Sequence, residues 1–457
     1  MGEPVALDAL GPRGAYRSRN REVIADISGT PVAELSLVPP IFVTRALGAL
    51  RKAVPLAPDE RARALDEAGR LFRTTTIAGQ SPEQYQYLVS RVSGVPISLA
   101  RSCTELLPAH AGQAFRTIRQ ARPAGALECW RDPLTRTGSA VWTRRGKVFA
   151  VLTSGNHPAV HAPWLEALAL GYQVAVRPSR REPFTAFRLV HALWEAGFGP
   201  DQVVLLPTDH GVADEILRGA DLGMVYGGDD VVAKYGAHPH VLPQGPGRSK
   251  ILVTADVDWR AHLDTMVSSI SHQGGTACTN ATAVLVEGDP APVAEAIAER
   301  LAALPALPPE DPKAVLPALP YDEAKAVERC LLERAAGSRA VLGGEGVLEP
   351  LPGGGAVLRP AVHAVPSADA KQVGVELPFP CVWVAPWNRT AGIAPLRNSL
   401  VVTAMTRDES LVDLLLEEPT ISNVYLGNHP THWLPPGIPH DGYLAEFLMR
   451  TKAVIRD

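Results

Sequence analysis

The sequence predicts an α/β protein in which a doubly wound parallel sheet is followed by a second α/β domain. From Trp142 onward, short apolar runs alternate with helical patterns of roughly 10–15 residues, which is typical of parallel sheets. At 457 residues the chain is also too long for one small core. A lone cysteine, Cys278, follows a glycine pair and precedes the strand-like run Thr282–Val286. We therefore expect two domains, with the chemistry near this cysteine.

The composition excludes several classes of protein. Hydrophobic residues make up 46% of the chain and charged residues 20%, as in ordinary globular proteins. The net charge of −4 offers no basic surface for nucleic acid. No run reaches the ~18 uncharged apolar residues that a membrane helix requires, and Met1 to Asn20 does not resemble a signal peptide. Five scattered cysteines without a CxxC pair predict a reduced, cytoplasmic chain with no membrane partner.

Residues 1–125 are the least regular part of the sequence. We expect them to form a helical region that packs on a domain spanning residues 126–249. The helix-like patterns cover Arg61–Ile77, Pro82–Val92 and Gln113–Arg119.

The alternating patterns within residues 126–249 predict that this segment forms the parallel sheet. Strand-like runs occur at Lys147–Leu152, Gln173–Val176, Gln202–Leu206, Leu222–Val225 and near Val241; helical patterns cover Ala159–Leu170, Phe184–Ala196, Gly211–Arg218 and Asp229–Tyr235. A sheet of this kind binds ligands at the carboxyl ends of its strands. The loops at 153–158, 177–183 and 226–230 are therefore candidates for a binding site.

A second domain is expected over residues 250–430, and a C-terminal segment over residues 431–457. The second domain includes Cys278, helices near 291–303 and 321–336, and strands near 356–358 and 381–384. The apolar run Leu444–Ile455 could add a strand to the sheet of a partner, or it could be a frayed end.

Cys278 is the candidate nucleophile. Glycines let the chain turn between a helix and a strand, and such a turn exposes a thiol and its own backbone N–H. Cysteine is the best nucleophile among the side chains. The alternative is a small buried apolar residue, which is the usual environment of a lone cysteine.

Taken in order, the segments from Trp142 to Ile455 resemble the aldehyde dehydrogenase superfamily. The resemblance implies that Asn156, in the turn Ser154-Gly155-Asn156, occupies the place of the family's oxyanion asparagine. Its amide and the Cys278 backbone N–H would together stabilise the oxygen that becomes negative when sulfur adds to a carbonyl. An asparagine that caps the following helix is the structural alternative.

The resemblance also implies a nicotinamide cofactor. Arg177-Pro178-Ser179 is similar to the family's segment at the adenosine ribose, beside Ser154. At the next position NAD-preferring members often have glutamate, whereas Arg180 and Arg181 offer positive charge that suits a 2′-phosphate, so we expect NADP rather than NAD. A solvated basic loop is the alternative.

Two further segments extend the expected cofactor site. Tyr226-Gly227-Gly228 resembles the family's glycine turn, where the backbone approaches the cofactor and the helix start favours phosphate. Glu376, in Glu-Leu-Pro-Phe-Pro, resembles the family's glutamate that accepts hydrogen bonds from the nicotinamide ribose, although the order of the last residues differs.

Gln244 occupies the position of the family's general base, which is a glutamate in hydrolytic members. An amide accepts no proton at neutral pH, so water would lack its activating group. A thiol such as coenzyme A or a carrier-protein phosphopantetheine needs less help, and residues 245–249 are similar to those of the fatty-acyl reductase branch linked to bioluminescence. We therefore expect reduction of an acyl thioester to an aldehyde, with an acyl carrier protein as one candidate partner. The alternatives are oxidation of an aldehyde to an acid, or a catalytically drifted member.

The histidines of two loops allow a different interpretation, a metal site. His238 with His240, or His429 with His432 and His440, are the candidates, but no cysteine or carboxylate stands at ligand spacing. We expect surface residues and no metal. The resemblance further implies a homodimer or homotetramer with a small oligomerisation appendage.

Overall fold

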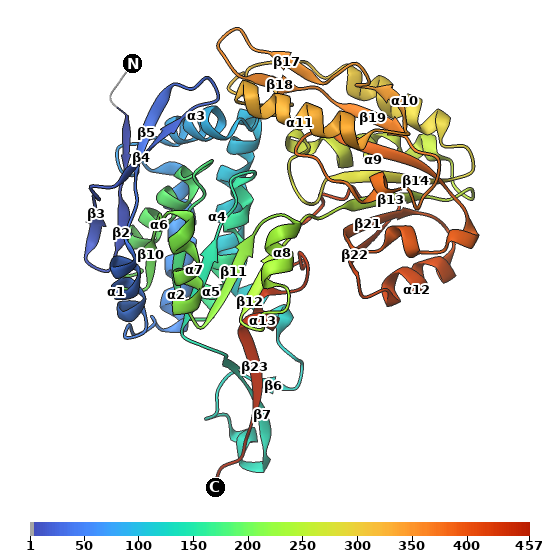
Figure 1. The fold of residues 1–457 in the computed structure, drawn as a ribbon. Helices are drawn as coiled ribbons and strands as arrows, with labels where there is room; N and C mark the ends of the chain where they lie inside the picture. Colours follow the sequence, from blue (N-terminus) through green and yellow to red (C-terminus); the bar gives the residue numbers. More distant parts are fainter. Residues whose placement is uncertain (1–3) are drawn as a thin grey trace.

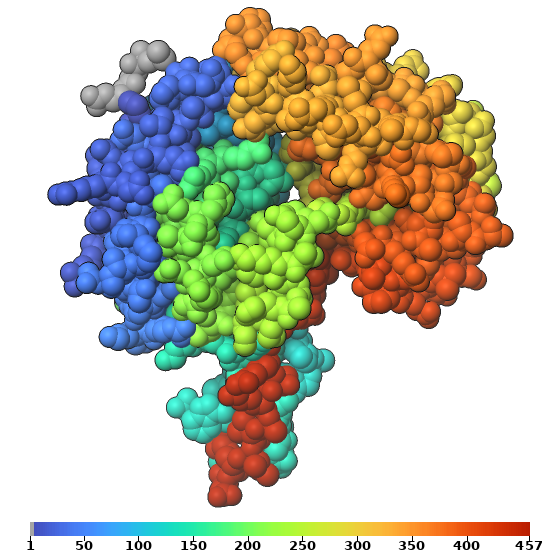
Figure 2. Space-filling view, in the orientation of Figure 1, coloured from blue at the N-terminus to red at the C-terminus, as the bar shows by residue number. Residues whose placement is uncertain are grey.

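The computed structural model describes residues 4–457. It has two lobes and a narrow ribbon that points away from both (Figure 1). The first lobe contains residues from the N-terminal half of the chain, and the second contains most of residues 249–426. In the space-filling view the surfaces of the two lobes part and leave an opening between them (Figure 2).

The first sheet has the strand order β12-β11-β8-β9-β10-β2-β3. Five neighbouring strands, from the β12 edge inward, are parallel: β8 (Val148–Leu152), β9 (Gln173–Arg177), β10 (Val203–Leu205), β11 (Leu222–Tyr226) and β12 (Val241–Gln244). The strand order reverses at β8, because β9 lies on one side of it and β11 on the other. Open parallel sheets bind ligands at such a reversal, outside the carboxyl ends of the strands.

Helices cover both faces of this sheet, as the apolar runs of its strands require. One face packs against α5 (Pro163–Ala169) and α6 (Phe184–Glu195). The opposite face packs against α1 (Pro40–Leu50) and α7 (His210–Gly219). The helix α8 (Asp229–Tyr235) has the range that the sequence predicted.

The N-terminal region is not purely helical, so that expectation is wrong. It contains α1, α2 (Pro58–Thr74), α3 (Pro82–Ser93) and α4 (Ile97–Ala121), but also five strands: β1 (Val5–Leu7), β2 (Ala9–Gly11), β3 (Gly14–Tyr16), β4 (Arg21–Ala25) and β5 (Pro31–Ser36). β1, β5 and β4 form a separate sheet, whereas β2 and β3 extend the first one. Strands of three residues are too short to show an alternating pattern.

The second sheet has the order β16-β19-β20-β14-β13-β21-β22. These strands span Arg339–Leu342, Ala361–Ala364, Cys381–Trp387, Ala281–Glu287, Ser249–Val253, Ser399–Met405 and Ile421–Leu426; the accompanying helices are α9 (Leu263–Ser271), α10 (Ala291–Ala302), α11 (Tyr321–Arg334) and α12 (Glu409–Glu417). The expected strand near 356–358 is β18 (Ala356–Leu358). It belongs instead to a small sheet with β15 (Ala318–Leu319) and β17 (Leu348–Pro350).

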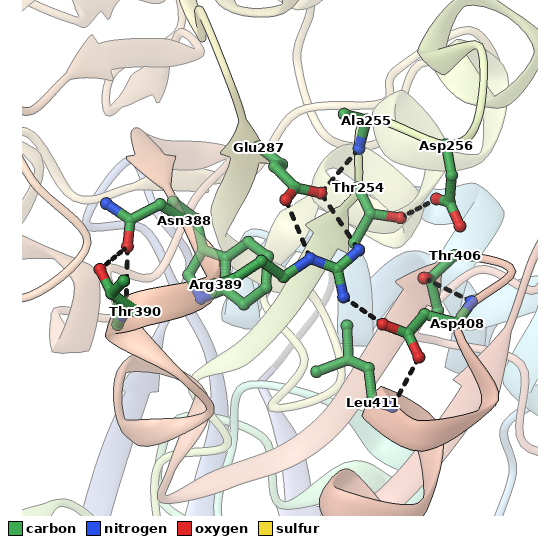
Figure 3. A network of polar contacts seen from close by, with 12 residues as sticks. Thr254, Ala255, Asp256, Glu287, Asn388, Arg389, Thr390, Thr406, Asp408 and Leu411 are labelled. Atoms are coloured by element: carbon green, nitrogen blue, oxygen red, sulfur yellow. Dashed lines mark hydrogen bonds and ion pairs between the residues drawn. The ribbon is translucent and has the colours of Figure 1, made fainter.

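Arg389 joins the carboxyl ends of several strands in the second sheet (Figure 3). Its guanidinium donates to Glu287 at the end of β14, with Nε 2.9 Å from Oε1, and to Asp408. Asp408 in turn accepts the backbone N–H of Leu411 at the start of α12. This end of the sheet is therefore closed by internal ion pairs, which leaves the opposite end to face the first domain.

The ribbon combines segments that are far apart in the sequence. β7 (Ser139–Arg144) lies between the short β6 (Ala126–Leu127) and β23 (Met449–Val454), which follows α13 (Leu444–Leu448). Residues 126–144 thus belong to the ribbon, not to the first domain as expected. The C-terminal run is not frayed, because β23 pairs along its whole length with β7. β23 is an edge strand of this sheet, so pairing with the strand of another chain stays a prediction.

None of the helices within residues 4–457 is long and apolar enough to cross a membrane.

Two buried tryptophans provide a test of how the second domain is held together. Trp383 Nε1 donates to the Val375 carbonyl at 3.1 Å, and Trp387 Nε1 donates to the Gly392 carbonyl at 2.8 Å. We expect Trp383→Phe and Trp387→Phe each to lower the free energy of unfolding by about 1–3 kcal/mol, because each leaves a carbonyl without its donor. Denaturant unfolding measures this loss, and an unchanged midpoint would contradict it.

The two variants differ in where they loosen the chain. Hydrogen exchange should accelerate at residues 371–376 in Trp383→Phe only, since Trp387 contacts a different loop. Equal exchange in both variants would show that Trp383 does not hold this segment.

Candidate active site

Cys278 lies on the turn between α9 and β14, where the amino end of the second sheet faces the carboxyl ends of β8, β11 and β12. The turn is held by Asn280, whose Oδ1 accepts the Ala277 N–H at 2.9 Å and whose Nδ2 donates to the Ser269 and His272 carbonyls. Cys278 itself is partly buried. The thiol is therefore fixed in place without being sealed in the core, as a nucleophile requires.

The segment before β13 packs tightly on the cysteine backbone. A side chain at Gly247 would place its Cβ 1.8 Å from the Cys278 carbonyl oxygen, so only glycine fits there. Ser249 Oγ donates to the same carbonyl at 3.1 Å. These contacts hold the connection between the two domains against the cysteine.

Asn156 reaches the same turn from the end of β8. Its Nδ2 donates to the Thr276 carbonyl at 2.9 Å, two residues before Cys278. The helix cap that was the alternative role belongs to His157, whose Nδ1 accepts the Ala159 N–H. The structure thus brings Asn156 and Cys278 together, with the Asn156 amide bonded internally.

His440 provides the group that the sequence analysis missed. Its Nε2 lies 3.3 Å from Cys278 Sγ, and its Nδ1 lies 3.3 Å from Asp441 Oδ1. Gln244 Nε2 donates to the same Asp441 oxygen at 3.2 Å. A nucleophile, an imidazole and an orienting carboxylate in this order form the arrangement that activates nucleophiles on many folds.

Charge stabilises this arrangement. Burial alone would lower the pKa of His440, but Cys278 and Asp441 raise it well above its usual range. For Asp441, burial acts to raise the pKa, and the hydrogen bonds and charge of His440, with the Gln244 N–H, bring it below its usual value. The sulfur and the carboxylate thus both favour the protonated form of the imidazole.

The expectation that the loop histidines are surface residues is wrong for His432 and His440. His432 stacks on His272 with ring centres 3.7 Å apart, and burial lowers its pKa to about 4. Within residues 4–457 no group of three or more His, Cys, Asp or Glu side chains is placed to hold a metal ion. The adjacent pair His440-Asp441 was the sequence signal, but nothing in the sequence linked it to Cys278, 162 positions away.

Glu376 lies beside the interdomain connection. Its Oε2 accepts the Arg248 N–H at 2.8 Å, and burial raises the pKa of its carboxyl despite that bond. The Arg248 guanidinium contacts Asp229, with Nη2 2.6 Å from each carboxylate oxygen. The predicted ribose acceptor therefore stands next to a cation that faces the first domain.

Ser154, Arg177 and Ser179 lie together at the ends of β8 and β9. Arg177 is buried and donates to Thr208 through Nε and Nη2, at 3.0 and 3.1 Å. A side chain at Gly155 would place its Cβ 2.5 Å from Ser179 Oγ, so the two loops touch. Arg177 is thus a structural cation under the loop, and the serines lie above it.

Arg180 does not offer a free guanidinium. It pairs with Glu22 at 2.9 Å and with Asp209 at 3.0 Å. A 2′-phosphate would have to compete with both carboxylates. Of the two cations behind the expected preference for NADP, only Arg181 is largely exposed, 3.3 Å from Glu323, and the preference stays a prediction.

Gly227 and Gly228 lie between β11 and α8, as expected, but the helix start is acidic. Asp229 and Asp230 open the seven-residue α8. A Cβ at Gly227 would lie 2.3 Å from Val231 Cγ2, so packing within the turn also requires this glycine. The negative charge stands where the resemblance implied phosphate.

The residues at this crevice fit a nicotinamide dinucleotide in their chemistry. The crevice lies where the strand order reverses, between the loops after β8 and β11. Glu376 supplies an acceptor for ribose hydroxyls. Arg248 Nε is buried without a hydrogen-bond partner, which is the state of a donor that awaits an acidic group.

A cavity of about 790 Å³ lies elsewhere in the second domain. Arg248 and Lys250 line one side of it, and residues 366–374 and 386–398 line the rest. Cys278 and His440 do not border it. Size alone does not mark an active site, so we place the chemistry at the thiol, where a nucleophile and a base are in contact.

Comparisons with known proteins place the chain in a family. The model of the aldehyde dehydrogenase family matches residues 16–443. The betaine aldehyde dehydrogenase of Cereibacter sphaeroides is 27% identical over 369 residues, which cover 75% of this chain and 71% of that protein. A betaine aldehyde dehydrogenase of Rhizobium meliloti is 25% identical and covers 58% of this chain and 55% of its own.

Solved structures share the fold at low identity. A variant of 1-pyrroline-5-carboxylate dehydrogenase from Thermus thermophilus superposes with a TM-score of 0.82 at 16% identity, covering 99% of this chain and 93% of that one. Indole-3-acetaldehyde dehydrogenase of P. syringae, solved in complex with NAD+ and IAA, has a TM-score of 0.82 at 18% identity, with 98% and 96% covered.

The contact between Cys278 and His440 predicts how the thiol reacts with a neutral alkylating agent. In the wild-type protein the imidazole lies beside the sulfur and can take the thiol proton, so iodoacetamide should alkylate Cys278 readily. We expect His440→Gln to slow alkylation roughly tenfold at pH 7, because the sulfur then loses the base that it contacts. Mass spectrometry of the labelled Cys278 peptide measures the rate, and equal rates in the two proteins would contradict the contact.

Proposed function

This chain belongs to the aldehyde dehydrogenase family, and from that membership we propose that it is an NAD(P)-dependent oxidoreductase that converts an aldehyde to a carboxylic acid. The observation that supports this reading is the 3.3 Å contact between Cys278 Sγ and His440 Nε2. It supplies a base at the nucleophile, where the sequence analysis expected none.

Cys278 begins the reaction as the nucleophile. His440 holds the thiol proton, and the sulfur adds to the aldehyde carbon to give a tetrahedral adduct on the enzyme. The Asn156 amide releases the Thr276 carbonyl and donates its hydrogen bond to the developing oxyanion instead. The Cys278 N–H is the second donor to this oxygen. A donor of this kind typically lowers the barrier by about 3 kcal/mol.

When bound, the nicotinamide accepts the hydride that leaves the adduct. Ser154, Ser179, Gly227, Gly228, Arg248 and Glu376 are the residues that would hold the cofactor in its crevice. Glu376 holds the ribose hydroxyls, and the Cys278 turn is kept close by Gly247. The product on the enzyme is a thioester at Cys278.

His440 completes the reaction by accepting a proton from the water that attacks the thioester. Asp441 orients the ring through Nδ1 and stabilises its cationic form. The cationic imidazole must first release a proton, so turnover rises with pH as His440 titrates. Because a base is present, the replacement of the family's glutamate by Gln244 no longer argues against water as the group that attacks the thioester. Relatives that this chain matches are named betaine aldehyde dehydrogenases, which supports the same reaction.

Reduction of an acyl thioester remains a second candidate, supported by one observation. Gln244 donates to Asp441 and cannot act as a base itself. A thiol such as coenzyme A, or the phosphopantetheine of an acyl carrier protein, could then release the acyl group in place of water. The two candidates share Cys278, Asn156 and the nicotinamide. In the direction of aldehyde oxidation they differ in whether water or a thiol attacks the thioester at Cys278, and reduction of an acyl thioester is the reverse of the thiol route.

A variant of the base separates the two routes. With an aldehyde and NAD(P)+ at pH 9, His440→Gln should give a burst of one reduced cofactor per active site followed by slow turnover, because hydroxide can take the thiol proton at this pH, whereas attack of water on the thioester still needs the base. Adding coenzyme A should restore turnover in this variant, since a thiolate attacks without a base. Stopped-flow absorbance at 340 nm measures both phases.

The control is His432→Gln, which changes a neighbouring histidine that has no contact with Cys278. It should keep wild-type deacylation. Cys278→Ala should abolish all turnover. If wild-type enzyme forms no carboxylate without added thiol, the hydrolytic proposal is wrong.

Restoring the family's carboxylate provides a second test. Gln244→Glu would place a negative charge against Asp441, which now accepts the Gln244 N–H at 3.2 Å. We expect kcat for acid formation to fall roughly tenfold, because the altered carboxylate pair no longer orients His440. A rise in kcat would show that the glutamate is the better base and that His440 does not serve deacylation.

A further inference from the structure

Arg248 has three unusual features. Its backbone has a φ of +46°, in the left-handed region that side chains other than glycine rarely adopt. Its guanidinium uses one nitrogen, Nη2, for both oxygens of Asp229, while Nε is buried with no partner. Strain and an unsatisfied buried donor at one residue indicate a functional position.

The ion pair of Arg248 with Asp229 joins the two domains. Asp229 directly follows the β11 turn in the first domain, whereas Arg248 directly precedes β13 in the second. The pair therefore spans the crevice at the reversal of strand order, where a dinucleotide would enter. Figure 1 shows α8 on the side of the first lobe that faces the second.

We propose that this ion pair occupies the crevice in the free protein, and that the diphosphate of a nicotinamide dinucleotide replaces Asp229 on Arg248. Arg248 is then a cofactor-binding residue and Asp229 is its internal competitor. This inference rests on the proposed function, because it takes its ligand from it.

The chemistry of the guanidinium favours the exchange of Asp229 for a diphosphate. A guanidinium binds a diphosphate through two parallel N–H donors, and the free Nε beside Nη2 offers this fork. Asp229 takes Nη2 alone and is largely exposed, with 73% of its side chain accessible, so the pair is weak enough to be displaced. A diphosphate adjacent to Asp229 and Asp230 would otherwise meet only negative charge on this turn.

The other charged groups near Arg248 do not take over its role. Glu376 accepts the Arg248 backbone N–H and leaves the guanidinium free. Lys250 donates to the Arg248 and Arg397 carbonyls and to Ser399 Oγ, and burial lowers its pKa to about 8. Arg248 is thus the cation on the second domain that is placed to change partners.

The test measures binding rather than turnover. The affinities of the full-length protein for NADPH and NADH are determined from the change in nicotinamide fluorescence, at low and high salt. We expect Asp229→Asn to tighten binding roughly two- to fivefold, because the competitor is removed. Arg248→Met should weaken binding roughly tenfold or more, because charged hydrogen bonds to the diphosphate are lost.

Asp230→Asn is the matched control, since it removes the same charge one residue away without touching Arg248. It should tighten binding less than Asp229→Asn. In the Arg248→Met background, Asp229→Asn should have no larger effect than Asp230→Asn, because the competition acts through Arg248. Circular dichroism and thermal melts verify that each variant is folded.

Two failures are distinguishable. Suppose that the wild type binds a dinucleotide but that Asp229→Asn weakens binding, or tightens it no more than Asp230→Asn does. The proposed exchange of Asp229 for the diphosphate is then wrong, and the proposed function stands. If the wild type and all variants bind neither dinucleotide, the proposed function fails and this inference fails with it.

Discussion

The contact between the sulfur of Cys278 and the imidazole of His440 is the interaction on which the proposed chemistry of this protein depends. It joins a turn before β14 to a loop near the end of the chain. Each side is fixed separately: Asn280 holds the cysteine turn, and Asn423 of β22 donates to the His440 carbonyl. Because both anchors lie in the second domain, the nucleophile and its base form one unit to which the first domain presents Asn156.

A common feature of the candidate ligand donors is that each is already bonded within the chain. Asn156 donates to Thr276, Arg180 pairs with Glu22 and Asp209, and Arg248 contacts Asp229. Binding at this site is thus an exchange of partners, so its free energy is a difference between two sets of polar contacts. This explains why sequence motifs alone overstate the affinity for a charged ligand: they show the donors but not the acceptors that already use them.

The parts of the structure that could be predicted from the sequence are those with local signals. The helix α8 and the parallel strands β8 to β12 follow from apolar periodicity and turn residues, and the family resemblance follows from ordered motifs along one segment. The contact of His440 with Cys278 could not be predicted, because it depends on tertiary packing across 162 positions. The pairing of β7 with β23 could not be predicted for the same reason. The N-terminal strands could not be predicted because they are too short to show an alternating pattern.

The position of β23 after His440 has a consequence for biosynthesis. The segment that contains the imidazole is anchored at its far end by pairing with β7, whose residues are translated some three hundred positions earlier. A nascent chain on the ribosome therefore exposes the thiol long before it can acquire its base. Assembly of the reactive centre must therefore wait until β23 has been synthesised and has paired with β7.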